Sequence, residues 1–336
     1  MKEWKKLYDL MKRIHELKPW EWMDEIDVFG VEDPETGVIG YVSIMGQLGE
    51  HYSIAVYLGQ EGLGGLWSLH ENALDFKPEM LLEIPQLQAS FEDEDMLDPE
   101  DKMIIKKIGL SFKDEQAWPM FRSFRPGFFP WHLEAWEQKF LVHVLEQTIQ
   151  MVLRVKVNPG LLEPEDENED EYLVRKLING SEWEDVTTDQ PLLESMSIPL
   201  SISARQINLF KYLPLSRNIW EIGFSWTPAP VKDNSARPYY PYLLFVLHKK
   251  SEMILGHELL TPLPSLKEMR GTIPDKFLEL AVRIGKRPEE IHVNSELLYQ
   301  VLYPLNEATG LRIKFKQSLP KLENAMDHML EFLGEK

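Results

Sequence analysis

Residues 27–58 read DVFGVEDPETGVIGYVSIMGQLGEHYSIAVYL, and this stretch decides the expected fold. Three runs in it, Asp27–Val31, Val38–Met45 and His51–Leu58, are rich in Val, Ile and Tyr, a composition typical of strands. The first two flank residues 33–37, DPETG, which favour a tight turn. The stretch therefore predicts three consecutive antiparallel strands.

A helix precedes these strands, and helices alternate with strands after them. Residues 2–17 repeat apolar side chains at three- and four-residue spacing, which predicts an amphipathic helix. After the strands, the same reasoning predicts a helix at Gly62–Leu74, a strand within Met80–Phe91, a helix at Pro99–Ile108, a strand at Trp118–Phe124 and a helix at Leu133–Val155. After the first helix, the order is βββαβαβα.

An acidic segment divides the chain. Asn158-Pro159-Gly160 should end the preceding helix, and LLEPEDENEDE follows it. Residues 158–171 hold seven acidic residues and no basic one, which favours a solvated linker over a cation-binding or interaction segment. We therefore predict an N-terminal domain at 1–157, a linker at 158–171 and a C-terminal domain at 172–336.

The second half repeats the same element order. Its predicted strands are Ile219–Trp226, Tyr242–His248, Met253–Leu260, Ile291–Asn294 and Leu311–Lys316, and its predicted helices are Ile273–Ile284, Ser295–Glu307 and Leu319–Leu333. The predicted fold class is α/β (α+β), with two mixed-sheet domains. Three antiparallel strands followed by helices and two parallel strands match the ribonuclease-H-like fold, so two degenerate copies of that fold are expected.

An active two-metal nuclease is not expected from these residues. Nuclease members of that fold hold metal ions with carboxylates on the first and fourth strands and on two helices. If Tyr242–His248 is the first strand of the C-terminal half, it offers no acid, and the fourth strand ends in Asn294. In the N-terminal half, Asp27, Glu71 and Asp93 could occupy positions similar to those metal-binding carboxylates. Acidic residues are common in this half, however, so their presence does not favour a nuclease.

The composition excludes several function classes. The chain has no cysteine, so disulfides, thiolate metal sites and cysteine nucleophiles are ruled out. The net charge of −19 disfavours general nucleic-acid binding because phosphate is repelled. No run of 18 apolar residues and no signal-peptide pattern occurs, so we expect no membrane span and a cytoplasmic location.

One segment is unusual for a loop region. Residues 118–131, WPMFRSFRPGFFPW, contain six aromatic residues and the two arginines Arg122 and Arg125. Arginine binds carboxylates and phosphates at two points, and aromatic residues such as Trp131 anchor ligands at binding surfaces. On a regular strand the two arginines face opposite sides, so they share a pocket only if the strand ends near Arg125. The alternative is that the aromatics are core and the arginines pair with acids.

Four further polar residues complete the candidate ligand site. Glu50 and His51 lead into the third strand, and Gln86 and Gln88 share one strand face, where they either contact a ligand or face water. We predict a non-catalytic binding or scaffold protein with a protein partner or a small anionic ligand. The alternative is a hydrolase of phosphorylated or nucleotide substrates, with Glu50 or His51 as base. No catalytic residue, metal ligand or cofactor is assigned.

Five segments carry a family resemblance. They are WEWM (20–23), DPETGVIGYVSIMG (33–46), GEHYSIAVYLGQEGL (49–63), LLEIPQLQASFED (81–93) and AWPMFRSFRPGFFPW (117–131). Together they resemble an uncharacterised family of bacterial proteins. The C-terminal part, with RPEEI (287–291) and Leu319-Pro320, is similar to a second domain of unknown function. The resemblance implies a bacterial, cytoplasmic setting and no particular activity.

Overall fold

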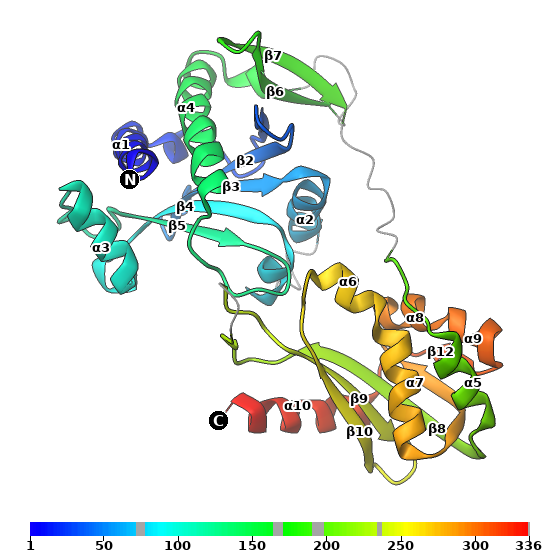
Figure 1. The fold of residues 1–336 in the computed structure, drawn as a ribbon. Helices are drawn as coiled ribbons and strands as arrows, with labels where there is room; N and C mark the ends of the chain where they lie inside the picture. Colours follow the sequence, from blue (N-terminus) through cyan, green and yellow to red (C-terminus); the bar gives the residue numbers. More distant parts are fainter. Residues whose placement is uncertain (72–77, 164–170, 190–197, 234–236, 335–336) are drawn as a thin grey trace. The chain divides into compact units, whose positions relative to one another are not determined.

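The computed structural model describes residues 1–71, 78–163, 171–189, 198–233 and 237–334. The chain divides into two compact units, and most of their elements are labelled in Figure 1. Unit 1 holds Met1–Arg125 and Pro130–Glu194, and unit 2 holds Pro126–Phe129 and Ser195–Lys336. The short segment Pro126–Phe129 thus belongs to unit 2, although unit 1 residues flank it in the sequence.

Unit 1 is built on a seven-stranded sheet of order β5-β4-β3-β2-β1-β6-β7. Neighbouring strands run antiparallel except β1 and β6, which are parallel. The elements are α1 (Lys2–Leu17), β1 (Phe29–Glu32), β2 (Ile39–Met45), β3 (Tyr52–Leu58), α2 (Gly59–Glu71), β4 (Gln86–Glu92), α3 (Pro99–Ile108), β5 (Trp118–Phe124), α4 (Ala135–Val157), β6 (Glu171–Ile178) and β7 (Glu182–Asp189).

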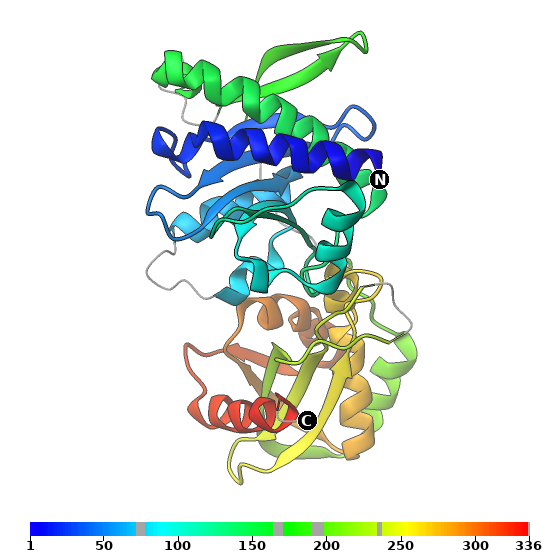
Figure 2. The same ribbon diagram turned by 90° about the vertical axis from the view of Figure 1, so that its left-hand side faces the viewer.

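Helices cover both faces of this sheet. The apolar side of α1 buries Leu7, Met11 and Ile14, the spacing that predicted the helix. This side packs with α4 over one face of the sheet, where Figure 2 shows the two helices side by side. On the other face, α2 packs against Tyr41 and Tyr57. At 23 residues α4 is long, yet neither it nor any other described helix is apolar enough to cross a membrane.

The predicted element order of the N-terminal half is confirmed, but its predicted topology is wrong. Three strands, then α2, β4, α3, β5 and α4, follow each other as expected. However, β4 pairs antiparallel with β3, and β5 pairs antiparallel with β4, so strands β1 to β5 form a meander. A ribonuclease-H-like fold would need the last two strands to run parallel. Unit 1 therefore does not have that fold.

The predicted domain boundary at 158–171 is also corrected. Strands β6 and β7 follow that segment, yet they extend the sheet of unit 1 because β6 pairs with β1. The hairpin turns at Asn179 and Gly180, whose positive φ angles of 51° and 73° suit a tight hairpin turn. The strands on either side of this turn were not expected from the sequence. Residues 164–170 of the predicted linker lie outside the described residues.

Unit 2 is built on a five-stranded sheet of order β10-β9-β8-β11-β12. Its elements are α5 (Ala204–Tyr212), β8 (Leu215–Trp226), β9 (Tyr242–His248), β10 (Ile254–Leu260), α6 (Leu266–Gly271), α7 (Ile273–Ile284), β11 (Arg287–Val293), α8 (Glu296–Leu302), α9 (Pro304–Thr309), β12 (Arg312–Phe315) and α10 (Pro320–Gly334). The larger core lies beneath α5 to α9, and a smaller core lies between α10 and the opposite face.

The strand directions of unit 2 match the expectation for a ribonuclease-H-like fold. Strands β8, β9 and β10 are antiparallel, and β11 and β12 add in parallel beside β8. The first strand is β8 and not Tyr242–His248, so the sequence argument that the first strand offers no acid was wrong. The predicted helix Ser295–Glu307 is two helices, because Pro304 begins α9.

Candidate functional site

The Arg/aromatic segment runs along one edge of the unit 1 sheet. Strand β5 buries Phe121 and Ser123 and ends at Phe124. The chain then returns beside it, because Ser123 and Trp131 exchange two backbone hydrogen bonds of 2.7 and 3.0 Å. The strand therefore ends before Arg125, which is the condition under which the two arginines could share a pocket. Their side chains nevertheless bind different acids.

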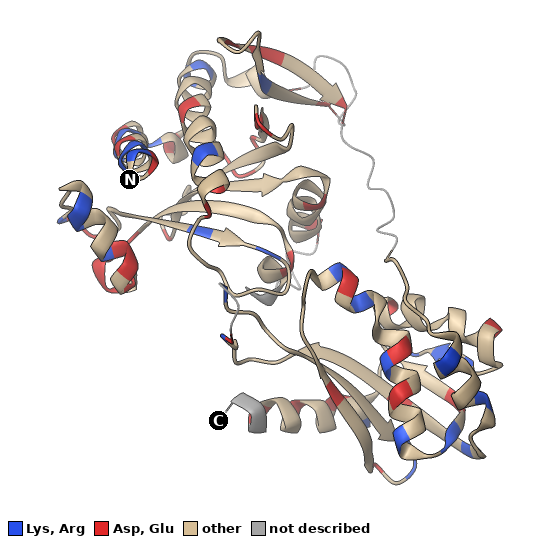
Figure 3. Ribbon diagram, in the orientation of Figure 1, with Lys and Arg blue, Asp and Glu red and all other residues tan. Residues whose placement is uncertain are grey.

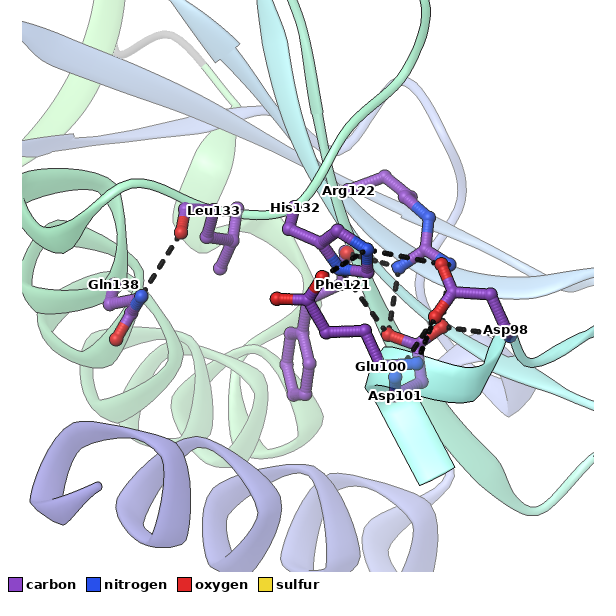
Figure 4. A network of polar contacts seen from close by, with 8 residues as sticks. All are labelled: Asp98, Glu100, Asp101, Phe121, Arg122, His132, Leu133 and Gln138. Carbon is purple, nitrogen blue, oxygen red and sulfur yellow. Dashed lines mark hydrogen bonds and ion pairs between the residues drawn. The ribbon is translucent and has the colours of Figure 1, made fainter. Parts of the chain in front are cut away.

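Arg122 is clamped to the start of α3. Its two terminal nitrogens donate to the Asp101 carboxylate at 3.0 and 2.5 Å, and one also lies 3.3 Å from Asp98 Oδ2 (Figure 4). Burial acts to lower the pKa of Arg122, but the hydrogen bonds and charge of Asp101 outweigh it and raise that pKa. Only 3% of Asp101 is exposed, so this is a buried ion pair.

Helix capping explains why two aspartates meet here. Asp98 Oδ1 accepts hydrogen bonds from the backbone N–H groups of Glu100 and Asp101 at 2.8 and 3.0 Å. In the reverse direction, Asp101 Oδ2 accepts a hydrogen bond from the Asp98 backbone N–H. This reciprocal pair begins α3. Burial acts to raise the pKa of Asp98, but the Asp101 N–H, His132 and Arg122 lower it below its ordinary value.

His132 joins this cluster from the returning segment. Its Nε2 lies 3.1 Å from Asp98 Oδ2 and 3.4 Å from Glu100 Oε2 (Figure 4). Its Nδ1 lies 3.7 Å from Asp101 Oδ1, beyond hydrogen-bond distance, and has no hydrogen-bond partner among the described residues. Sequence reasoning missed His132 because its partners lie more than thirty positions upstream. Its only sequence signal is its place beside Trp131.

Arg125 has a separate set of partners at the start of α4. It donates to Glu134 at 2.8 Å and to Glu137 at 2.9 Å. Glu137 is 1% exposed and also accepts from the Ser123 hydroxyl at 2.7 Å and from the Glu134 backbone N–H at 2.6 Å. Each arginine is therefore paired to acids within unit 1, which is the structural alternative weighed from the sequence.

The structure brings some of the remaining candidates together. His51 Nε2 lies 3.1 Å from Gln88 Nε2, and Gln88 stands opposite Arg122 on the neighbouring strand. Gln86 is 3% exposed and does not face water. Glu50 contributes its backbone carbonyl, which accepts from Gln116. Among the described residues, no ion pair or hydrogen bond links Glu50 or His51 to either arginine.

Unit 2 has its own buried charged cluster on the face that α10 covers. Glu221 on β8 is 3% exposed and lies 3.7 Å from Lys249 Nζ, which lies 3.2 Å from His292 Nδ1. His292 Nε2 contacts Glu290 at 2.7 Å, and Lys314 contacts Glu290 at 2.9 Å. Lysines thus lie against the acids of β8 and β11, which correspond in order to the strands on which ribonuclease-H-like nucleases hold metal ions.

The comparisons with known proteins agree with this two-unit chain. Residues 4–175 match the family model described as Domain of unknown function (DUF7309), and residues 206–330 match Domain of unknown function (DUF6930). No curated protein matches the chain. The resemblance to two domains of unknown function is confirmed. The chain belongs to the DUF7309 family, whose model covers about half of it, and it carries a DUF6930 domain in its second half.

Proposed function

We propose that the protein is a non-catalytic binding protein of the bacterial cytoplasm, whose partner is an extended polypeptide segment that adds to strand β10. The observation that carries this proposal is an unprotected sheet edge beside an apolar groove in unit 2. An edge strand offers unpaired backbone N–H and C=O groups, so it can pair with a strand from another chain.

The other three sheet edges carry protective features. Strand β7 has four acidic residues among eight, EWEDVTTD. Strand β12 has only four residues, RIKF, and two of them are basic. Strand β5 is already bridged at Ser123 by Trp131. Charge, shortness and covering are the ways in which proteins protect edge strands, so none of these three edges favours partner binding.

Strand β10 has weaker protection, which is limited to one β-bulge and one acidic residue, Glu258. It has seven residues, ILGHELL, and pairs on one side with β9. No other described strand pairs with its outer side. Two apolar side chains on it, Ile254 and Leu259, are each 49% exposed. A bulge near its start shifts the register between Ile254 and Gly256, and the remaining residues pair regularly. An apolar edge of this length suits pairing with another chain.

A groove beside β10 would receive the partner's side chains. Two hollows of ≈ 270 and ≈ 280 Å³ share Leu255 of β10 and Ile284 of α7. At Gly256 a methyl group would lie 3.2 Å from Leu280, so the glycine keeps this floor open. Of the two basic residues lining the hollows, Arg283 is paired with Glu258 of β10, and Lys286 forms no ion pair among the described residues. The best complement is an extended segment with alternate apolar residues and acidic neighbours.

The hydrolase alternative has weaker support. It requires Arg122 or Arg125 to stabilise charge that develops on a substrate. Arg122 is bound to Asp101 at two points, and Arg125 to Glu134 and Glu137. The first turn of α3 carries acids and its last turn carries two lysines, and Figure 3 shows negative charge at the start of the helix and positive charge at its end, so the acids that bind Arg122 also suit the helix dipole. Both arginines therefore have internal partners.

Peptide display tests this proposal. A random-peptide phage library panned against the full-length protein should enrich sequences with alternate apolar residues and flanking Asp or Glu. Synthetic versions would then be measured by fluorescence anisotropy. The backbone N–H groups of β10 point alternately toward β9 and toward the outer edge of the sheet. Counted from the His248–Met253 hydrogen bond and across the bulge, the N–H of His257 points toward the outer edge. His257→Pro should weaken binding by about tenfold, since an unmade buried hydrogen bond costs about 1–3 kcal/mol.

Charge reversal gives a second readout with a matched control. Lys286→Glu should weaken the binding of an acidic peptide, whereas Lys211→Glu, at an exposed position of α5, should leave that affinity unchanged. A peptide with N-methylated alternate amides should also lose binding, and this variant leaves the protein unchanged. Failure to enrich any peptide, or equal affinities for wild type and His257→Pro, would refute docking at β10.

A further inference from the structure

We propose that a hollow in unit 1 binds a small organic cation, with an ammonium head and an apolar tail. The hollow measures ≈ 470 Å³, within the range of about 300–1,000 Å³ that is typical of small-molecule sites. Three parts of unit 1 line it: the end of α1 with the turn after it, the tip of the β2–β3 hairpin, and residues 115–116 before β5. The site does not depend on the peptide site proposed for unit 2.

Aromatic rings form one wall of this hollow. The ring centroids of Trp20 and Tyr52 lie 4.5 Å apart, and the His15 ring lies 6.3 Å from that of Trp20. At Gly46 a methyl group would lie 2.5 Å from a ring carbon of Tyr52, so the glycine lets the hairpin lie against this wall. Leu48, which is 87% exposed, adds apolar surface at the hairpin tip. Aromatic rings attract cations and also bury the apolar part of a ligand.

Three polar groups that line the hollow are available to a ligand. Among the described residues, no hydrogen bond or ion pair involves the His15 imidazole, the Tyr52 hydroxyl or the Glu115 carboxylate. Burial, and after it the charge of Lys18, lowers the pKa of His15, so the ring is neutral at pH 7 and one of its nitrogens can accept a hydrogen bond. All three groups can therefore accept hydrogen bonds from an ammonium head.

The charges around the hollow favour a cation over an anion. Glu21 and Glu115 bring two negative charges and Lys18 brings one positive charge, so one negative charge remains. Lys18 is 55% exposed and lies 3.9 Å from Glu21, which leaves Glu115 without an internal counter-charge. The C-terminal end of α1 adds partial negative charge, because the last carbonyls of a helix lack partners within it. A ligand with one positive charge balances this site.

Calorimetry with three ligands that share one tail tests this site. The full-length protein would be titrated with hexylamine, hexyltrimethylammonium and 1-hexanol at neutral pH and low salt, because salt screens exposed charges. At least one of the two cations should bind saturably and about tenfold more tightly than the uncharged alcohol, which corresponds to about 1.4 kcal/mol. Tighter binding of hexylamine would identify a hydrogen-bonded primary ammonium, and tighter binding of hexyltrimethylammonium would identify a quaternary ammonium held by the rings.

Two charge variants should shift the affinity for the preferred cation in opposite directions. Glu115→Gln should weaken binding because it removes an attracting charge, and Lys18→Gln should strengthen binding because it removes a repelling one. Tyr52→Leu should weaken binding by about 2- to 30-fold, the range of one cation–π contact, whereas Tyr52→Phe keeps the ring and most of the affinity. Glu61→Gln, at an exposed position of α2, is the matched control and should leave the affinity unchanged.

The opposite signs of the two charge variants guard against misfolding, because a damaged fold does not produce a gain of affinity. Circular dichroism would confirm the fold of each variant. Weaker binding by Glu115→Gln and tighter binding by Lys18→Gln, with no change in Glu61→Gln, support the site. The absence of saturable binding by both cations overturns the proposal. Equal affinities for the cations and 1-hexanol also overturn it, as does the failure of either charge variant to shift the affinity in its stated direction.

Discussion

Replacement of Arg122 by methionine should destabilise unit 1 far more than the loss of an ordinary ion pair. The side chains of Arg122 and Asp101 are 13% and 4% exposed, so the pair is shielded from solvent. In Arg122→Met the Asp101 carboxylate keeps one bond from the Asp98 N–H but loses both guanidinium donors. Removing one partner of a buried pair typically costs about 3–5 kcal/mol, a large share of the stability of a domain.

The double variant Arg122→Met/Asp101→Asn separates charge from packing. Asparagine keeps an oxygen for the Asp98 N–H but carries no charge, so the double variant should recover more than half of the lost stability. Lys139→Met is the control, because Lys139 and Glu35 form an exposed pair worth about 0–1 kcal/mol. The assay is urea unfolding by circular dichroism in EDTA, fitted with one transition per unit. If Arg122→Met and Lys139→Met lose the same stability, the reasoning is refuted.

Two further predictions concern β7 and α2 of unit 1. The hydrogen bond from Arg154 is the main cause that lowers the pKa of Asp185 below its ordinary value of 3.8. The ion pair therefore stabilises the packing of β7 against α4 fully above pH 3.8. This stabilisation is lost when the pH falls through the lowered pKa and the Asp185 carboxylate takes up a proton. Amide exchange of β7 should therefore accelerate near pH 3, and exchange rates that match those at pH 6 after correction for intrinsic chemistry would contradict this. Gly62→Ala should cost about 1–3 kcal/mol in thermal unfolding, because a methyl group there lies 2.6 Å from the Tyr57 carbonyl carbon, a backbone atom that cannot move aside. Gly160→Ala, which meets only a flexible glutamate at 3.4 Å, is the control, and an equal loss in both would count against the steric argument.

Part of the candidate site could be anticipated from the sequence. The concentration of arginines and aromatics in residues 118–131 drew attention to the segment that carries Arg122 and Arg125, and the two-residue period of a strand gave the condition under which they could share a pocket. The sequence did not identify the acids that pair with the arginines. Asp101 and Glu137 looked like ordinary first-turn residues of two helices, and His132 had no visible partner. These contacts join elements far apart along the chain.

The local structure followed from the sequence alone. The helix at residues 2–17 and the strands of residues 27–58 depend on periodicity and on backbone preferences of adjacent residues. These preferences act over a few positions, so a single sequence reveals them. The same reasoning gave the mixed α/β class and the order of the elements, except that it missed β6, β7, α5 and α6.

Only the tertiary structure decided how the strands pair and which charges meet. The β6–β7 hairpin belongs to unit 1 because β6 pairs with the side of β1 that β2 leaves open. No local sequence pattern predicts with which strand β6 will pair. The directions of β4 and β5 exclude the ribonuclease-H-like fold in unit 1, whereas the parallel β11 and β12 match it in unit 2. Strand pairing and buried ion pairs depend on which surfaces the folded chain removes from water, and that is a property of the whole unit.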